Sequence, residues 1–261
     1  MNRYTKYQRK IKKYQKKLKK QKSKVKSKLI DFKDFIYRIG ISSTEDFTLK
    51  SLSKPILFPG HLGLIFVGEF TNNLFAEMKQ NLETIYPLFF FSISNLGLYD
   101  FSSEIFSKGI KKELKDNEKP KEILNLHPTN KFHQLIIDKK KEFSLDMIVA
   151  VTDLPLYSSS NNSIIFLVGE AHIPHQSCIV STLKLMETFY DREHNDILFQ
   201  IRLNKEIIHE VGHLILGPDH CENPSCVMSY SDTIREIDEK SLYLCKNCQK
   251  ELKTIKEKFN F

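Results

Sequence analysis

A dense run of histidine and cysteine residues in the last quarter of the chain constrains its fold more than any other feature. The run contains HEVGH at 209–213, GPDHC at 217–221, CVM at 226–228 and CKNC at 245–248. Imidazole and thiolate groups at such short spacings are the ligands that zinc takes in proteins. The run therefore predicts two zinc ions, one catalytic and one structural, with the chain folded around both.

The first part of this run has the spacing of a catalytic zinc site on a helix. His209 and His213 are four residues apart, so they share one face of a helix. Glu210 would hold a carboxylate near the metal without binding it, as a general base for a zinc-bound water requires. Asn195 or Asp196 is a suitable N-cap for this helix. We therefore predict an active-site helix whose apolar stripe is buried and whose histidines face a cleft.

The third ligand is ambiguous because a glycine stands one residue late. In the metzincin signature HExxHxxGxxH, the glycine lets the chain leave the helix so that a third histidine returns to the metal. Counting forward from His213 gives Asp219 as this ligand, whereas counting from Gly217 gives His220. We favour His220 because the Gly-x-x-His-Cys block is intact, and we keep Asp219 as the alternative. A helical bulge or a reshaped turn would absorb the extra residue.

Four of the five cysteines are predicted to form a closed thiolate site for the second zinc ion. They occur as two short pairs, Cys221 with Cys226 and Cys245 with Cys248. No cleavable signal segment is visible, and in a reducing compartment paired cysteines bind metal more often than they form disulfides. Because Cys221 directly follows His220, metal binding would also fix the turn that carries the third ligand. The fifth cysteine, Cys178, lies in an apolar run and is predicted to be a buried thiol.

The order of these motifs resembles that of the archaemetzincin family, in which Gly-x-x-His-Cys precedes Cys-x-Met and a distant C-x-x-C. Segments 168–171, 179–185 and 238–240 also look like parts of that family. The resemblance implies a zinc peptidase with Met228 in a turn beneath the catalytic metal. Tyr230 would stand near the metal, where it either stabilises an oxyanion or simply packs, and we favour packing.

The predicted fold class is α/β. Strand patterns at 62–67, 88–93, 147–151 and 178–181 alternate with helix patterns, including one at 74–85. The resemblance implies a mixed, mostly parallel twisted sheet with packed helices and an antiparallel edge strand near 164–171. An extended substrate peptide would pair with that edge.

The chain is expected to divide into three parts. These are a Lys-rich extension at 1–30, a metzincin-like N-terminal subdomain at 31–217, and a C-terminal subdomain at 218–261 with the cysteine site and the Met228 turn. We expect a loop with one helix over 102–142 and a charged helix near 236–259.

The basic character of the chain belongs to its first 29 residues. They contain 14 Lys or Arg and no acidic residue, which leaves a net charge of −6 on the rest, since the whole chain carries +8. Apolar residues at alternating three- and four-residue steps would form one side of a helix. This segment could contact nucleic acid or an anionic surface weakly, or could remain a solvated extension.

A zinc-dependent peptidase acting on peptide or protein substrates is the function that these features favour. No apolar stretch is long enough to span a bilayer, so we expect a cytoplasmic monomer. One alternative is a catalytically weak or inactive zinc-binding scaffold that uses the basic extension for interaction. Another is a gluzincin-like site completed by Glu236 or Glu239.

Overall fold

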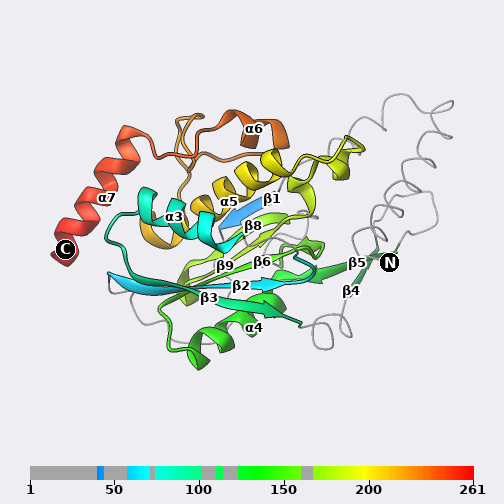
Figure 1. Ribbon diagram of the computed structural model, residues 1–261, viewed down its shortest axis with the longest axis horizontal. Coiled ribbons are helices and arrows are strands. Elements are labelled where there is room, and N and C mark those ends of the chain that lie inside the picture. Colours follow the sequence, from blue (N-terminus) through cyan, green and yellow to red (C-terminus); the bar gives the residue numbers. More distant parts are fainter. Residues whose placement is uncertain (1–39, 44–57, 71–73, 101–109, 114–122, 160–166) are drawn as a thin grey trace.

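The computed structural model describes residues 40–43, 58–70, 74–100, 110–113, 123–159 and 167–261 (Figure 1). The Lys-rich extension at 1–30 lies outside the described residues. Most of the described residues surround one large sheet. From one edge to the other its strands are β1 (Gly40–Ser43), β8 (Leu167–His172), β9 (Ser177–Ser181), β6 (Met147–Thr152), β2 (Gly60–Val67) and β3 (Phe90–Tyr99).

All neighbouring strands of this sheet are parallel except β8 and β9, which are antiparallel. The predicted mixed, mostly parallel sheet with an antiparallel strand is therefore confirmed. The outer side of β8 is nevertheless not free, because β1 pairs with it in parallel. The sequence patterns had predicted no strand at 40–43.

Helices cover both faces of the sheet, and successive residues of the central strands face two separate cores. On one face lie α3 (Phe75–Ile85) and α5 (Asp196–Leu216), and on the other lies α4 (Thr129–Glu142) (Figure 1). Leu64 of β2 belongs to the same buried cluster as Leu203 of α5, whereas Ile65 belongs to the cluster that contains Phe132 of α4. Burial on both faces explains why β2 and β6 read as continuous apolar runs.

Two strands of a small second sheet lie within residues 102–142, where the sequence predicted only a loop with one helix. This sheet contains β4 (Ile110–Glu113), β5 (Ile123–Pro128) and β7 (Leu156–Tyr157). The predicted helix is α4. The connection between β8 and β9 contains the 3₁₀ turn η2 (Ile173–His175), and two more, η3 (Leu183–Leu185) and η4 (Glu187–Tyr190), precede α5.

Two short helices follow α5. These are α6 (Ile234–Glu239) and α7 (Lys246–Phe259), so the single charged helix predicted near 236–259 is wrong. The chain between them is extended at Lys240, and Cys245 becomes the N-cap of α7. This break places both cysteines of the last pair at the start of one helix. No helix in the described part of the chain is long and apolar enough to cross a bilayer.

Candidate metal centre

Three imidazole groups meet beside the end of α5. The Nε2 atoms of His209 and His213 are 3.0 Å apart, as expected for residues one helical turn apart on the same face. The ring of His220 lies 5.3 Å from that of His209 and 4.8 Å from that of His213, measured between centroids. One ligand atom from each of the three lies within 4.8 Å of the others. With zinc–nitrogen bonds of about 2.0–2.1 Å, tetrahedral ligand atoms are about 3.3 Å apart, so this set fits a zinc ion.

Backbone carbonyl groups orient two of the rings. Nδ1 of His209 donates to the carbonyl oxygen of Val227 at 2.8 Å, and Nδ1 of His213 donates to that of Gly217 at 2.9 Å. Each bond places the ring proton on Nδ1 and leaves the Nε2 lone pair for a metal. Burial lowers the pKa of His213 to about 4 and that of His209 well below its ordinary value. Both imidazoles are therefore held in the neutral form that binds metal.

The extra residue before Gly217 is absorbed at the end of α5. The helix continues through Leu216, and Gly217 then adopts φ 107° and ψ −175°, a conformation that side chains with a Cβ rarely adopt. Nothing stands within 4 Å of a Cβ built there, so the requirement for glycine is conformational. The turn brings His220 to the other two rings, and its Nε2 is buried without a hydrogen-bond partner among the described residues. Asp219 is exposed and lies outside this group.

Glu210 follows His209 on α5 and is buried, with no hydrogen bond to its carboxylate from the described residues. The carboxylate lies against β8, where a Cβ on Gly169 would overlap it. Glycine is therefore required at residue 169 by the close approach of this side chain. Burial, followed by the negative charges of Glu206 and Glu170, raises the pKa of Glu210 well above its ordinary value, and Lys240 opposes the rise. A carboxylate in this state accepts a proton readily.

Met228 packs directly beneath α5. A Cβ on Gly212, in the middle of the helix, would overlap the sulfur of Met228 and the hydroxyl of Tyr86. That hydroxyl donates to the carbonyl oxygen of Ile208 at 2.8 Å. A glycine inside a helix costs roughly 0.5–1 kcal/mol relative to alanine, so its presence was the sequence signal for this close contact. Tyr230 stands edge-on to His220, at 5.3 Å between ring centroids.

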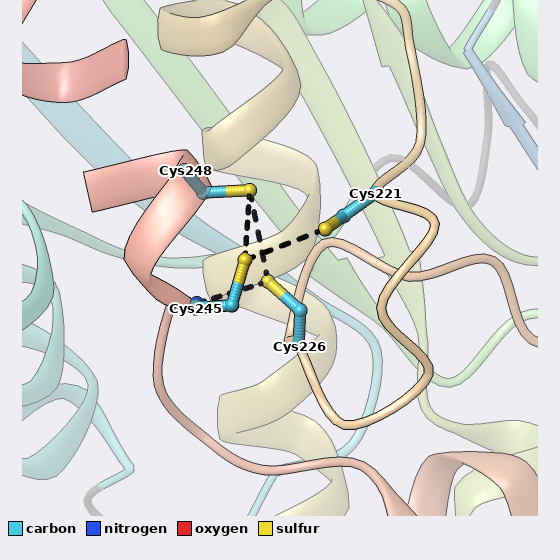
Figure 2. Close-up of side chains that lie close together, drawn as sticks. All are labelled: Cys221, Cys226, Cys245 and Cys248. Carbon is cyan, nitrogen blue, oxygen red and sulfur yellow. Dashed lines mark hydrogen bonds between the residues drawn. The ribbon is translucent and has the colours of Figure 1, made fainter. Parts of the chain in front are cut away.

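The four cysteines form a second group, whose sulfur atoms point toward one another (Figure 2). Cys221 and Cys226 come from the segment after α5, while Cys245 and Cys248 begin α7. Three of the sulfur–sulfur distances are 3.5, 3.7 and 3.8 Å. A tetrahedral zinc ion with bonds of about 2.3 Å has sulfur ligands about 3.8 Å apart, whereas a disulfide bond is about 2.0 Å long. The spacing fits a thiolate-bound zinc ion. Cys178 is a buried free thiol in β9, as predicted.

A buried polar seam, which the sequence patterns did not reveal, joins α5 to α6 and the residue after it. Arg202 binds Asp238 through two contacts of 2.6 Å, and Lys240 forms an ion pair with Glu206 at 3.0 Å. The side-chain nitrogen of Lys205 donates to the carbonyl oxygens of residues 237 and 238. Glu206 precedes His209 by about one helical turn. The seam therefore holds the ligand-bearing helix and the C-terminal segment in one arrangement.

Neither acid of the gluzincin alternative lies in the imidazole group. Glu236 closes a capping box with Thr233 at the start of α6, and Glu239 pairs with Arg235 on the exposed side of that helix. The three histidines are therefore the ligand set that this part of the structure offers for the first metal.

Comparisons with known proteins identify the family of this chain. Residues 122–254, about half of the chain, match the family model of peptidase family M54. The chain belongs to this family. Among its M54 relatives, the archaemetzincin of Methanocaldococcus jannaschii is 37% identical over 121 residues, which cover 46% of this chain and 65% of that protein. The match thus spans slightly less than two thirds of that relative's length. The archaemetzincin of Pyrococcus furiosus is 27% identical over 71% of this chain and 88% of its own.

Solved structures of similar proteins share the fold of this M54 chain. The crystal structure of archaemetzincin from Methanopyrus kandleri aligns with a TM-score of 0.54 and 21% identity, covering 76% of this chain and 95% of that one. A zinc-dependent peptidase from Methanocorpusculum labreanum also gives 0.54, at 22% identity, covering 73% of this chain and 99% of that one. At this level of identity the likeness concerns the fold alone.

Proposed function

We propose that this M54 chain is a zinc-dependent metallopeptidase that hydrolyses peptide bonds in a peptide or protein substrate. The observation that carries the proposal is a buried carboxylate without a hydrogen-bond partner among the described residues, on the helix that supplies two of three converging imidazoles. His209, His213 and His220 would hold a catalytic zinc ion. The four clustered cysteines would hold a structural one. Thiols in this role need a reducing location, so a cytoplasmic protein is part of the proposal.

The chemistry assigns separate roles to the metal and to the protein. When bound, zinc supplies a Lewis acid that polarises a peptide carbonyl and acidifies water. Glu210 accepts a proton from the attacking water and then delivers it to the departing amine. The raised pKa of this carboxyl makes it a stronger proton acceptor than an ordinary glutamate. Val227 and Gly217 keep the proton on Nδ1 of the two helical imidazoles throughout.

Replacing Glu210 with Gln tests the role of the base. The zinc-loaded variant and the wild type should be assayed on a library of internally quenched peptides, with zinc content measured on the same samples. We expect hydrolysis to fall by at least about 100-fold, since general-base catalysis contributes about 10²–10⁴-fold, while two zinc ions remain bound. Glu193, an exposed glutamate before α5, provides the matched control as Glu193→Gln. Equal activity in both variants would contradict the proposal.

The third ligand is tested separately. His220→Ala should lose about one zinc ion per chain and all hydrolysis, whereas Asp219→Ala should keep both. The reverse result would identify Asp219 as the third ligand. Wild-type protein that holds two zinc ions and yet cleaves no peptide would favour the scaffold alternative, with the basic residues 1–29 as its interaction segment.

A further inference from the structure

The outer side of β8 is already paired by a segment of the same chain. β1 runs parallel to β8, with Ile41 opposite Gly169, Ser42 opposite Glu170 and Ser43 opposite Ala171 (Figure 1). These two segments are far apart in sequence. β1 is thus added to the sheet as an incoming peptide would be, through main-chain pairing with an exposed edge.

This pairing occurs beside the proposed base. Gly169, opposite Ile41, is the residue against which the Glu210 carboxylate packs. On the other side of β8, the thiol of Cys178 in β9 donates to the backbone carbonyl oxygen of Glu210 at 3.2 Å. The register of β1 is therefore centred on the part of β8 nearest to the reacting carboxylate.

The outer side of β8 is covered by β1. Every residue of β8 is buried, and Glu210 is fully buried while β1 is in place. A strand edge that receives a substrate must offer unpaired N–H and C=O groups. Since β1 occupies this side of β8, an extended peptide can pair there only after β1 has left.

Several properties of β1 suit a strand that can leave. It has four residues, begins with glycine and shows an irregular register between Gly40 and Ile41. Glycine is a poor strand former, and parallel pairing is slightly weaker per residue than antiparallel pairing. The neighbouring strands β9, β6 and β2 have five, six and eight residues, and they lie between two helical layers (Figure 1).

We propose that β1 is an autoinhibitory strand that occupies the peptide-binding edge of β8 and must be displaced before substrate binds. The inference rests on the proposed peptidase function, since it concerns regulation of that same site. If β1 is released in fewer than about one in ten molecules, the apparent affinity for peptide is reduced at least about tenfold. Displacing β1 should raise the apparent affinity for peptide by the same factor.

The test uses the full-length, zinc-loaded chain with the double substitution Ile41→Pro and Ser42→Pro. Proline lacks the N–H donor, and adjacent N–H groups of a strand point to opposite sides, so one of the two should face β8. The matched control, Ile41→Ala with Ser42→Ala, keeps both donors. Three quantities are measured: amide hydrogen exchange at residues 167–172, kcat/KM on a quenched peptide substrate, and binding of a fluorescein-labelled form of that peptide in a Glu210→Gln background.

We expect the proline variant to exchange the β8 amides faster, to bind the labelled peptide at least about tenfold more tightly and to raise kcat/KM by a similar factor. The alanine control should resemble the wild type. A synthetic peptide of residues 38–45 should compete with the labelled peptide in the proline variant. Unchanged peptide binding together with unchanged β8 exchange would overturn the inference.

Two further outcomes separate this inference from the function on which it rests. If the proline variant binds peptide more tightly but no variant hydrolyses it, the autoinhibitory role of β1 is supported and the proposed peptidase function is contradicted. If the wild type hydrolyses peptide as fast as the proline variant, the autoinhibitory role of β1 is contradicted, while the proposed peptidase function is supported. If the proline variant aggregates, Ile41→Gly with Ser42→Gly replaces it. That variant should shift binding in the same direction by a smaller factor, and no shift would count against the proposal.

Discussion

Two buried glutamate carboxylates lie on opposite faces of β8, and their surroundings differ in almost every respect. Glu210, on α5, lies against one face with no hydrogen bond from the described residues, and its pKa is raised by burial. Glu170, within β8, points to the α4 side, where its carboxylate accepts from Ser158 at 2.7 Å and lies 3.3 Å from Nε2 of His133. Burial raises the pKa of Glu170, but the bonds and charge of His133, with further hydrogen bonds, lower it overall.

Under the proposed mechanism, the difference separates a side chain that takes part in the chemistry from one that stabilises the structure. A buried carboxylate that is fully hydrogen-bonded stabilises the fold only while its partners remain. A buried carboxylate without such partners contributes nothing comparable, but it is available to a substrate. The proposed reactive face and the structural face therefore meet at neighbouring residues of β8, Gly169 and Glu170.

The largest effect is expected when each glutamate is replaced by glutamine. The change at residue 210 should lower activity, whereas the change at residue 170 should lower stability. Glu210→Gln should lower kcat by about 10²–10⁴-fold and change the free energy of unfolding by less than about 1 kcal/mol. Glu170→Gln should leave at least about a tenth of kcat and mainly lower stability. Peptide hydrolysis and urea unfolding of both variants decide this, and similar kcat losses in the two would abolish the distinction.

Adding one methyl group at Gly169 should disturb the reactive face alone. The new Cβ would overlap the Glu210 carboxylate. We expect a fall in kcat of about 100-fold, as for a displacement of about 1 Å, and a stability loss of about 1–3 kcal/mol. Gly63→Ala is the control, because its Cβ would meet Leu145 and Leu96 in another part of the sheet. The Gly63→Ala variant should lose a similar free energy of unfolding but keep its kcat.

Removing hydrogen bonds around Glu170 should have a smaller effect than the changes near Glu210. The loss in unfolding free energy should grow with the number of bonds removed. Glu170→Gln should lower the free energy of unfolding by about 1–3 kcal/mol, because the uncharged amide cannot replace both contacts. Ser158→Ala removes only one hydroxyl donor and should cost about 1 kcal/mol. Thermal or urea unfolding measures both. A Ser158→Ala effect larger than that of Glu170→Gln would show that the serine acts through another contact.

The smallest expected effect is on the acid dependence of stability. The folded-state pKa of Glu170 lies below its unfolded value of about 4.3, so its contribution is complete above that pH and is lost as the pH falls through the folded pKa. The unfolding free energy of the wild type should therefore decrease more steeply below about pH 4.3 than that of Glu170→Gln. Parallel curves would mean that the carboxyl titrates alike in both states.

Local spacing predicted the site far better than it predicted the contacts around it. His209, Glu210 and His213 follow from the geometry of one helix, and the N-cap Asn195, whose side chain accepts from the Leu198 N–H, follows from local propensity. The pairing of His133 with Glu170 could not be inferred, because it depends on how α4 packs against the sheet. Nor could β1, whose four residues carry no strand pattern of their own.

The division of the charged C-terminal segment into α6 and α7 illustrates the same limit. Its composition favours a continuous helix, but Cys245 and Cys248 have to reach Cys221 and Cys226, and this long-range requirement overrides propensity. One local signal was present. Thr233 and Glu236 form the S/T-x-x-E pattern of a capping box and mark where α6 begins.

The position of the two ligand groups along the chain affects the order of events in biosynthesis. All seven proposed ligands lie at or after residue 209, whereas the last strand of the large sheet ends at Ser181. The ribosome therefore releases every strand of that sheet before any ligand emerges. Capture of the proposed metal ions would therefore follow synthesis of the whole sheet, and a nascent chain that stops before Cys248 would have every sheet strand but only three of the four proposed thiolate ligands.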